Sequence, residues 1–190
     1  MISTRTTAAT LATAALVLTG GAATAASKSH RDVTGDAPVA TADITRVVVK
    51  NGDHALMVQT KLAKATATRT HLVITLTPTA AGAPTYVART VEVGHRVGAT
   101  LETDQTTTTT DATTGETTGS TVTTPVDCAG IKATVSRGRR GQVLVRVPQA
   151  CFGADAGTLV AQVATQTGPQ VGAGTDDTTD ESAALRVKRG

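Results

Sequence analysis

The sequence has almost no aromatic residues. Its 190 residues include no tryptophan, one tyrosine (Tyr86) and one phenylalanine (Phe152). Carbohydrate-binding surfaces usually stack sugar rings on tryptophan or tyrosine, and aromatic side chains supply much of the contact area at recognition sites. An aromatic sugar platform is therefore excluded, and the core must be built from valine, leucine, isoleucine and alanine.

Concentrated positive charge is also scarce. The formal net charge is +3 at pH 7, and the tightest basic cluster is Arg-Gly-Arg-Arg-Gly at 137–141. Nucleic-acid binding requires a basic surface, usually with aromatic stacking partners. We therefore predict no nucleic-acid partner and interpret the cluster as a solvated hairpin turn; binding to an anionic cell-wall polymer or to a membrane surface stays open.

Recognisable catalytic patterns are missing. There is no G-x-S-x-G motif and no phosphate-binding glycine loop, and His30, His54, His71 and His95 are single and far apart. Serine hydrolases need a nucleophile beside a histidine, and catalytic zinc favours paired histidines at helical spacing. We interpret the histidines as exposed strand or turn residues and predict a protein that is not an enzyme. A secreted hydrolase with an unrecognised site is the alternative.

Met57 and His71 are the residue types that ligate haem in some proteins. A haem would need a large apolar pocket, and the chain has almost no aromatic residues to line one. We favour Met57 as a gap-filling core residue and His71 as a surface residue.

Residues 1–26 have the three parts of a secretory signal. Arg5 supplies a positive n-region, residues 8–18 form an uncharged apolar stretch, and Ala-Thr-Ala at 23–25 fits the A-x-A cleavage rule. The apolar stretch is shorter than the roughly 20 residues that span a bilayer. We predict a signal peptide over 1–26, a secreted extracellular protein without stable membrane insertion, and one domain over 27–190.

Cys128 and Cys151 are the only two cysteines. In an exported protein an even count of two predicts one disulfide. Alternating apolar residues in 128–136 and 142–148 predict a hairpin whose two ends bring these cysteines together.

Strand signals recur at short intervals along the rest of the chain. Asn51-Gly52 separates two apolar runs and predicts a hairpin of 44–50 with 55–62. Further strands are expected at 71–77, 86–93, 98–103, 157–165 and 183–187, with loops at 27–42 and 168–180. We predict an all-β fold: an antiparallel β-sandwich of about eight or nine short strands, with a closed barrel as the alternative.

Threonine makes up 40 of the 190 residues and dominates segment 104–124. This segment has few apolar side chains whose burial could offset its ordering entropy. We predict a long, flexible, disordered Thr-rich loop; O-glycosylation of its threonines and a β-hairpin extension are the alternatives.

Four carboxylates, Asp176, Asp177, Asp180 and Glu181, lie within six residues. Calcium favours oxygen-rich loops of this kind, although the spacing of an EF-hand is missing. We predict these residues as candidate calcium ligands, with Asp32, Asp36 or Asp43 as distant partners; the alternative is a solvated acidic loop, and no other cofactor is expected.

Several segments resemble a group of small exported actinobacterial proteins, mostly of unassigned function, with a predicted β-sandwich fold. The matching pieces are 43–47, Asp127-Cys128, Val145–Phe152, Asp176-Asp177 and Arg186–Gly190. Such proteins often carry a tryptophan shortly after the second cysteine, where this chain has Gly157-Thr158-Leu159. The resemblance implies a fold and an extracellular address, and no activity.

Our leading hypothesis is a secreted, non-catalytic β-sandwich domain with a binding or cell-surface interaction role. Its ligand is unknown, and a cell-wall or extracellular polymer is a candidate partner. The alternative within the same class is a calcium-stabilised extracellular adhesion module.

Overall fold

The computed structural model describes residues 25–66, 70–93, 96–110, 113–114, 117–153, 157–166 and 178–190. These ranges contain strands and one short 3-10 turn, and every strand pair is antiparallel. In chain order the elements are β1 (Ala26–Arg31), β2 (Ile44–Asn51), β3 (Ala55–Leu62), β4 (Lys64–Ala65), β5 (His71–Pro78), β6 (Thr85–Val93), β7 (Arg96–Thr110), β8 (Thr117–Pro125), β9 (Lys132–Ser136), β10 (Gly138–Arg139), β11 (Gln142–Pro148), the 3-10 turn η1 (Gln149–Cys151), β12 (Thr158–Gln166), β13 (Thr178–Glu181) and β14 (Leu185–Lys188). The predicted all-β class is confirmed.

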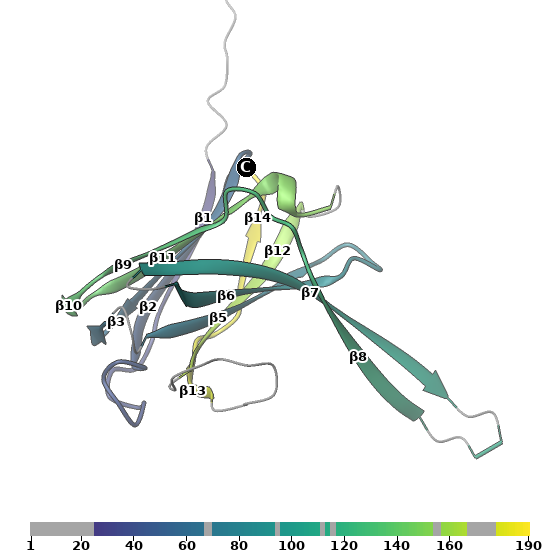
Figure 1. Cartoon of the computed structure of the whole chain (residues 1–190), viewed down its shortest axis with the longest axis horizontal. Coiled ribbons are helices and arrows are strands. Elements are labelled where there is room, and N and C mark those ends of the chain that lie inside the picture. Colours follow the sequence, from purple (N-terminus) through teal and green to yellow (C-terminus); the bar gives the residue numbers. More distant parts are fainter. Residues whose placement is uncertain are drawn as a thin grey trace, which may run out of the picture.

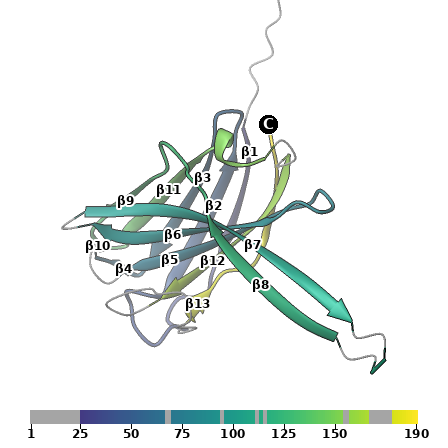
Figure 2. The same ribbon diagram turned by 45° about the vertical axis from the view of Figure 1, so that its right-hand side comes forward.

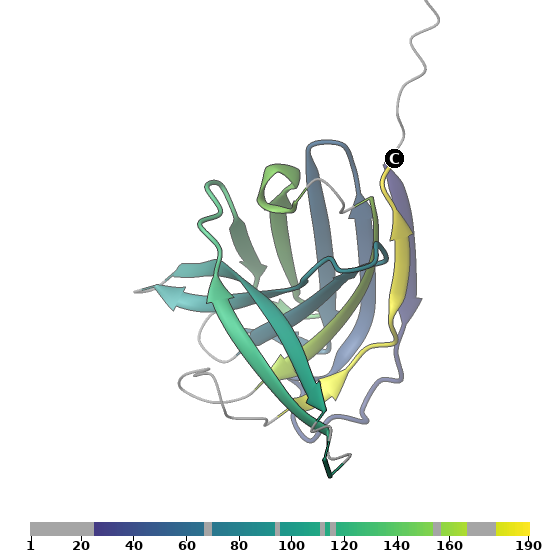
Figure 3. The same ribbon diagram turned by 90° about the vertical axis from the view of Figure 1, so that its right-hand side faces the viewer.

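Two main sheets form the sandwich (Figure 1). One has the strand order β1-β2-β3-β11-β9; the other has the order β13-β12-β5-β6-β7-β8, with β14 also paired to β12. The short strands β4 and β10 pair separately. Strands β1 and β14 lie side by side where the two sheets approach each other at one edge (Figure 3).

The alternation in the sequence decides which side chains form the core. In β3, Leu56, Val58, Thr60 and Leu62 are fully buried, while the side chains that alternate with them are only partly buried. In β5 of the other sheet, Ile74 and Leu76 are buried in the same core cluster. Successive side chains of a strand point to opposite faces, so the aliphatic residues of both sheets meet between them.

The two hairpins with the clearest sequence signals are present. Strands β2 and β3 pair from Ile44↔Leu62 to Asn51↔Leu56, and β9 pairs with β11. Between β9 and β11 the chain turns through the basic cluster, where Gly138 has φ 108° and Arg140 has φ 56°. Arginine is uncommon in this left-handed region, whereas glycine adopts it at little cost.

The structure contains more strands than predicted, because two segments expected to be loops form edge strands. β1 (Ala26–Arg31) covers the start of the predicted loop 27–42, and β13 (Thr178–Glu181) covers the end of the predicted loop 168–180. The residues of β1 are exposed or half-buried, so this strand carries no alternating apolar signal. Its pairing with β2 comes from the backbone ladder.

The threonine-rich segment also differs from the predicted loop. Residues 104–110 and 117–124 belong to β7 and β8, which pair in continuous register from Glu102↔Pro125 to Thr110↔Thr117. The ribbon projects away from the body of the sandwich (Figures 1 and 2). β7 is anchored in the core by buried Leu101, so the β7–β8 pair can extend without burying further apolar side chains. Threonine also favours extended backbone.

The predicted signal peptide falls almost entirely on residues 1–24, which lie outside the described part of the chain. Among the residues that are described, no helix is long and apolar enough to span a membrane.

Candidate functional site

Cys128 and Cys151 form the predicted disulfide, with Cα atoms 5.2 Å apart. Cys128 precedes β9, and Cys151 ends the 3-10 turn that follows β11. The bond therefore closes the open end of the β9–β11 hairpin. Neither sulfur is free for nucleophilic or metal chemistry.

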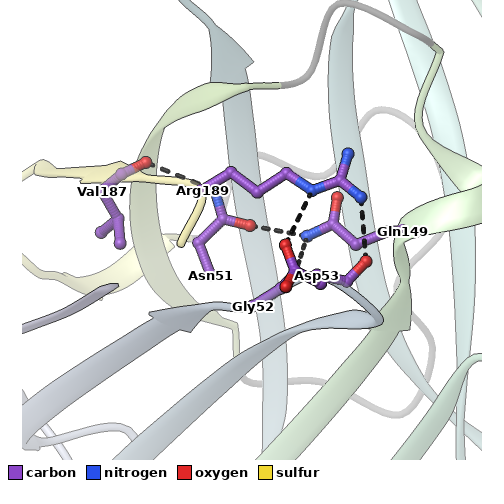
Figure 4. Close-up of polar contacts among 6 residues, drawn as sticks. All are labelled: Asn51, Gly52, Asp53, Gln149, Val187 and Arg189. Carbon is purple, nitrogen blue, oxygen red and sulfur yellow. Dashed lines mark hydrogen bonds and ion pairs between the residues drawn. The ribbon is translucent and has the colours of Figure 1, made fainter. Parts of the chain in front are cut away.

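A polar network, buried at Asn51 and Gln149 and exposed at Arg189, lies at the same end of the fold (Figure 4). Nε2 of Gln149 donates to Oδ1 of Asn51 at 2.6 Å and to the carbonyl of Gly52 at 2.9 Å. The guanidinium of Arg189 donates to the carbonyl of Asp53 at 2.9 Å. The network joins the β2–β3 turn to the segment before Cys151 and to the C-terminal residues, which is a structural role. Sequence reasoning missed it because its members are up to 138 positions apart in the sequence.

A cluster of carboxylates lies at the opposite end of β2. Asp36 belongs to the segment between β1 and β2, Asp43 directly precedes β2, and Asp180 lies in β13 of the other sheet. One carboxylate oxygen from each of these three residues lies within 4.8 Å of the other two. We call Asp36, Asp43 and Asp180 the carboxylate cluster.

Hydrogen bonds between the two sheets hold this cluster in place. Oδ2 of Asp180 accepts the amide N–H of Ile44 at 2.6 Å, and Oδ1 accepts the N–H of Glu181 at 2.8 Å. Thr165, on β12, donates its hydroxyl to the carbonyl of Ala42 at 2.7 Å. Asp43 is only 4% exposed, and its Oδ2 accepts the N–H of Gly35 at 2.8 Å. The backbone around Asp43 is therefore tied to both β12 and β13.

The surroundings of Asp180 disfavour the charged form of its carboxyl group. Burial is the main cause that raises the pKa of Asp180 above its ordinary value of 3.8, and the negative charges of Asp36 and Asp32 raise it further. The backbone N–H groups that bond to Asp180 oppose this rise in its pKa. The ion pairs found in the described ranges, Arg89–Glu102 and Arg189–Asp53, lie outside the cluster.

The structure brings together only some of the predicted calcium ligands. Asp180 meets the two distant partners Asp36 and Asp43, and Asp32 lies close enough to affect its pKa. The Glu181 side chain is exposed and is not part of the cluster. Asp176 and Asp177 lie outside the described residues, so their role stays a prediction.

The haem interpretation gains no support from the positions of its two residues. Met57 alternates with buried Leu56 and Val58, so its side chain points away from the core, and the prediction that it fills a gap in the core is wrong. His71 begins β5 in the other sheet. The prediction that His71 is a surface residue is wrong: it is 5% exposed, because β5 lies inside its sheet between β12 and β6.

One cleft of about 160 Å³ lies between the β5–β6 turn and Gly153. Tyr86 lines it, and the Tyr86 hydroxyl accepts the N–H of Gly153 at 2.9 Å. The Tyr86 ring also packs edge-on against Phe152. This volume is below the several hundred Å³ of typical small-molecule pockets, so we assign the cleft no ligand.

Comparison with known proteins leaves the resemblance untested: no protein-family model, curated protein sequence or solved structure matches the chain significantly.

Proposed function

We propose that the protein is a secreted, non-catalytic β-sandwich domain that binds an extracellular partner through its threonine-rich hairpin. We call residues 105–122 of this hairpin the threonine arm. The observation that carries the proposal is that the arm extends the β7–β8 pair away from the core. Every residue of the arm whose side chain is described is exposed.

The arm holds itself together without a core. The hydroxyls of Thr106 and Thr121 bond to each other at 3.2 Å across the two strands, and Thr107 donates to the carbonyl of Ser120 at 3.3 Å. Such cross-strand pairs each contribute about 0.2–1 kcal/mol. An ordered ribbon that adds nothing to the core of its own domain is suited to contact with another molecule.

The outer edge of β8 indicates what kind of partner fits. β8 is the last strand of its sheet, and residues 117–125 carry no charged side chain. Proteins commonly block exposed edges with charges or bulges, because an open edge pairs with other strands. The register between β7 and β8 also runs without a bulge. We propose that the partner is an extended polypeptide segment that adds beside β8 as a further strand.

The secreted location rests on two supports. Residues 1–26 have the pattern of an export signal, and the disulfide suits an oxidising compartment. The non-catalytic role rests on the absence of a recognisable nucleophile or metal-histidine pattern in the sequence.

The test is a binding measurement with a shortened arm. Residues 106–121 are replaced by Asn-Gly, which leaves Gln105 and Val122, an opposed pair, on either side of a tight turn. Labelled protein should bind to intact cells that produce it, and shortening the arm should weaken this binding at least about tenfold. Treating the cells with protease should also remove the binding.

The matched control is Lys50→Ala, an exposed change on β2 that should leave binding unchanged. Equal binding by the shortened and full-length proteins would refute the role of the arm. Binding that survives protease treatment would refute a polypeptide partner and indicate a non-protein polymer on the cell surface. Hydrolysis of a peptide or polysaccharide at an enzymatic turnover rate would refute the non-catalytic assignment.

A further inference from the structure

Asp43 is the most unusual member of the carboxylate cluster. While its Oδ2 accepts the N–H of Gly35, its Oδ1 is buried and has no hydrogen-bond partner among the described residues. Leaving an ionised carboxylate oxygen buried and unpartnered is costly, and buried charges in proteins are normally paired or bound to a metal. A carboxylate oxygen of Asp43 also lies within 4.8 Å of carboxylate oxygens of Asp36 and Asp180.

A nearby fourth carboxylate, that of Asp32, adds a further negative charge. Oδ2 of Asp32 is also buried without a hydrogen-bond partner, and its charge acts on Asp180. Neither of the two ion pairs in the described ranges brings an arginine or lysine to these groups. Four acidic side chains thus gather where no positive side chain pairs with them in the described part of the chain.

We infer that Asp36, Asp43 and Asp180 bind a calcium ion, with Asp32 beside the site. Calcium binds oxygen ligands at 2.3–2.6 Å, so two ligands on opposite sides of one ion lie up to about 5 Å apart. Carboxylate oxygens within 4.8 Å of one another can therefore share one ion. Asp36 is exposed, which opens the site to water, and water can complete the six to eight oxygens that calcium requires.

The ion ties together parts of the fold that are far apart in the sequence. It links the segment between β1 and β2 to β13 of the other sheet, at the end of β2 opposite the disulfide. Calcium therefore stabilises the folded sandwich. With three carboxylates the site belongs to the weak extracellular class, for which Kd is about 0.1–1 mM.

The test uses the disulfide-bonded protein, stripped with a chelator and then titrated with Ca²⁺ alone or Mg²⁺ alone. We expect calorimetry to detect Ca²⁺ binding, and a Ca²⁺ concentration ten times Kd should raise Tm by about 3–6 °C. Asp43→Asn should weaken Ca²⁺ binding at least about tenfold. Without calcium, this variant should be at least as stable as the wild type, because it removes a buried negative charge.

Two further variants separate the site from general charge effects and from misfolding. Asp36→Asn changes an exposed residue and should weaken Ca²⁺ binding without altering the fold, as judged by circular dichroism. Asp127→Asn makes the same charge change at an exposed position near the disulfide and should leave the Ca²⁺ response intact.

Three results would overturn the inference. One is a Tm that does not change between chelator and 10 mM Ca²⁺. Another is a Ca²⁺ response retained in Asp43→Asn but lost in Asp176→Asn or Asp177→Asn. The third is an equal response to Mg²⁺, which would remove the assignment to calcium. The arm takes no part in these measurements, so they are independent of the proposed binding function.

Discussion

Removing the disulfide should cost about a quarter to two thirds of the stability of a typical domain, which is about 5–15 kcal/mol. The perturbation is the double change Cys128→Ala and Cys151→Ala. The two cysteines are 23 positions apart, and a loop of this length corresponds to about 3.4 kcal/mol in the chain-entropy treatment of the unfolded state. For a protein of this size such a loss lowers Tm by about 7–14 °C.

The position of the bond adds a local effect. β9 is the edge strand of its sheet, pairs only with β11, and brings one buried residue, Ala133, to the core. Apart from the disulfide and this one ladder, the strand is held by its packing against β7. Its amide hydrogens should therefore lose more protection from exchange than those of β3, which lies between β2 and β11.

The assay is denaturant unfolding of the wild type, the reduced wild type and the double variant, together with hydrogen exchange. The reasoning is refuted if the double variant loses less than about 1 kcal/mol while the m-value stays unchanged, because the bridge would then constrain little in the unfolded chain. If the amide hydrogens of β3 and β9 lost protection equally, the expected local effect on β9 would be refuted.

Three further predictions follow from single contacts. Gly141→Ala should destabilise by about 1–3 kcal/mol in denaturant unfolding, because the added Cβ would lie 2.5 Å from two neighbouring atoms; Gly157→Ala, where nothing lies within 4 Å, should not destabilise. Thr90→Val should cost about 1–3 kcal/mol by leaving a buried amide of β5 unpaired, whereas exposed Thr100→Val should stay within about 0.5 kcal/mol. In chelator the raised pKa of Asp180 means that the folded state binds the Asp180 proton more tightly than the unfolded state does. The ionised carboxylate therefore destabilises the fold at high pH, and the free energy of unfolding should rise as pH falls through the folded pKa toward 3.8. Unfolding curves of Asp180→Asn across this pH range should lack that rise.

The sequence predicts those strands that bury the side chains of one face. The alternation of Leu56, Val58 and Leu62 identifies β3, and the Asn51-Gly52 turn fixes its hairpin partner. β1 could not be predicted in this way, because its side chains are not buried on one face and only its backbone pairing with β2 defines it. The small apolar area that segment 104–124 could bury predicts a loop, yet the threonine arm forms strands that continue a pair anchored at its base.

The sequence located the candidate calcium site only in part. Asp180 could be singled out because other acids lie near it in the chain, and the structure places it with Asp36 and Asp43. The exposed side chain of Glu181 is excluded from the cluster although it is the next residue, because neighbouring residues of a strand point to opposite faces.

The amino-acid sequence is enough to predict the all-β class, the disulfide and the lack of an aromatic binding platform. These properties follow from composition and from patterns between near neighbours, which act before any long-range contact forms. The packing of the two sheets, in contrast, is needed to know that Asp43 is buried and that Asp180 bonds to the amide of Ile44 at a separation of 136 residues. The same holds for the pairing of the threonine arm into a ribbon. Burial and charge proximity are set by which sheets pack together, and no local pattern in the chain records that packing.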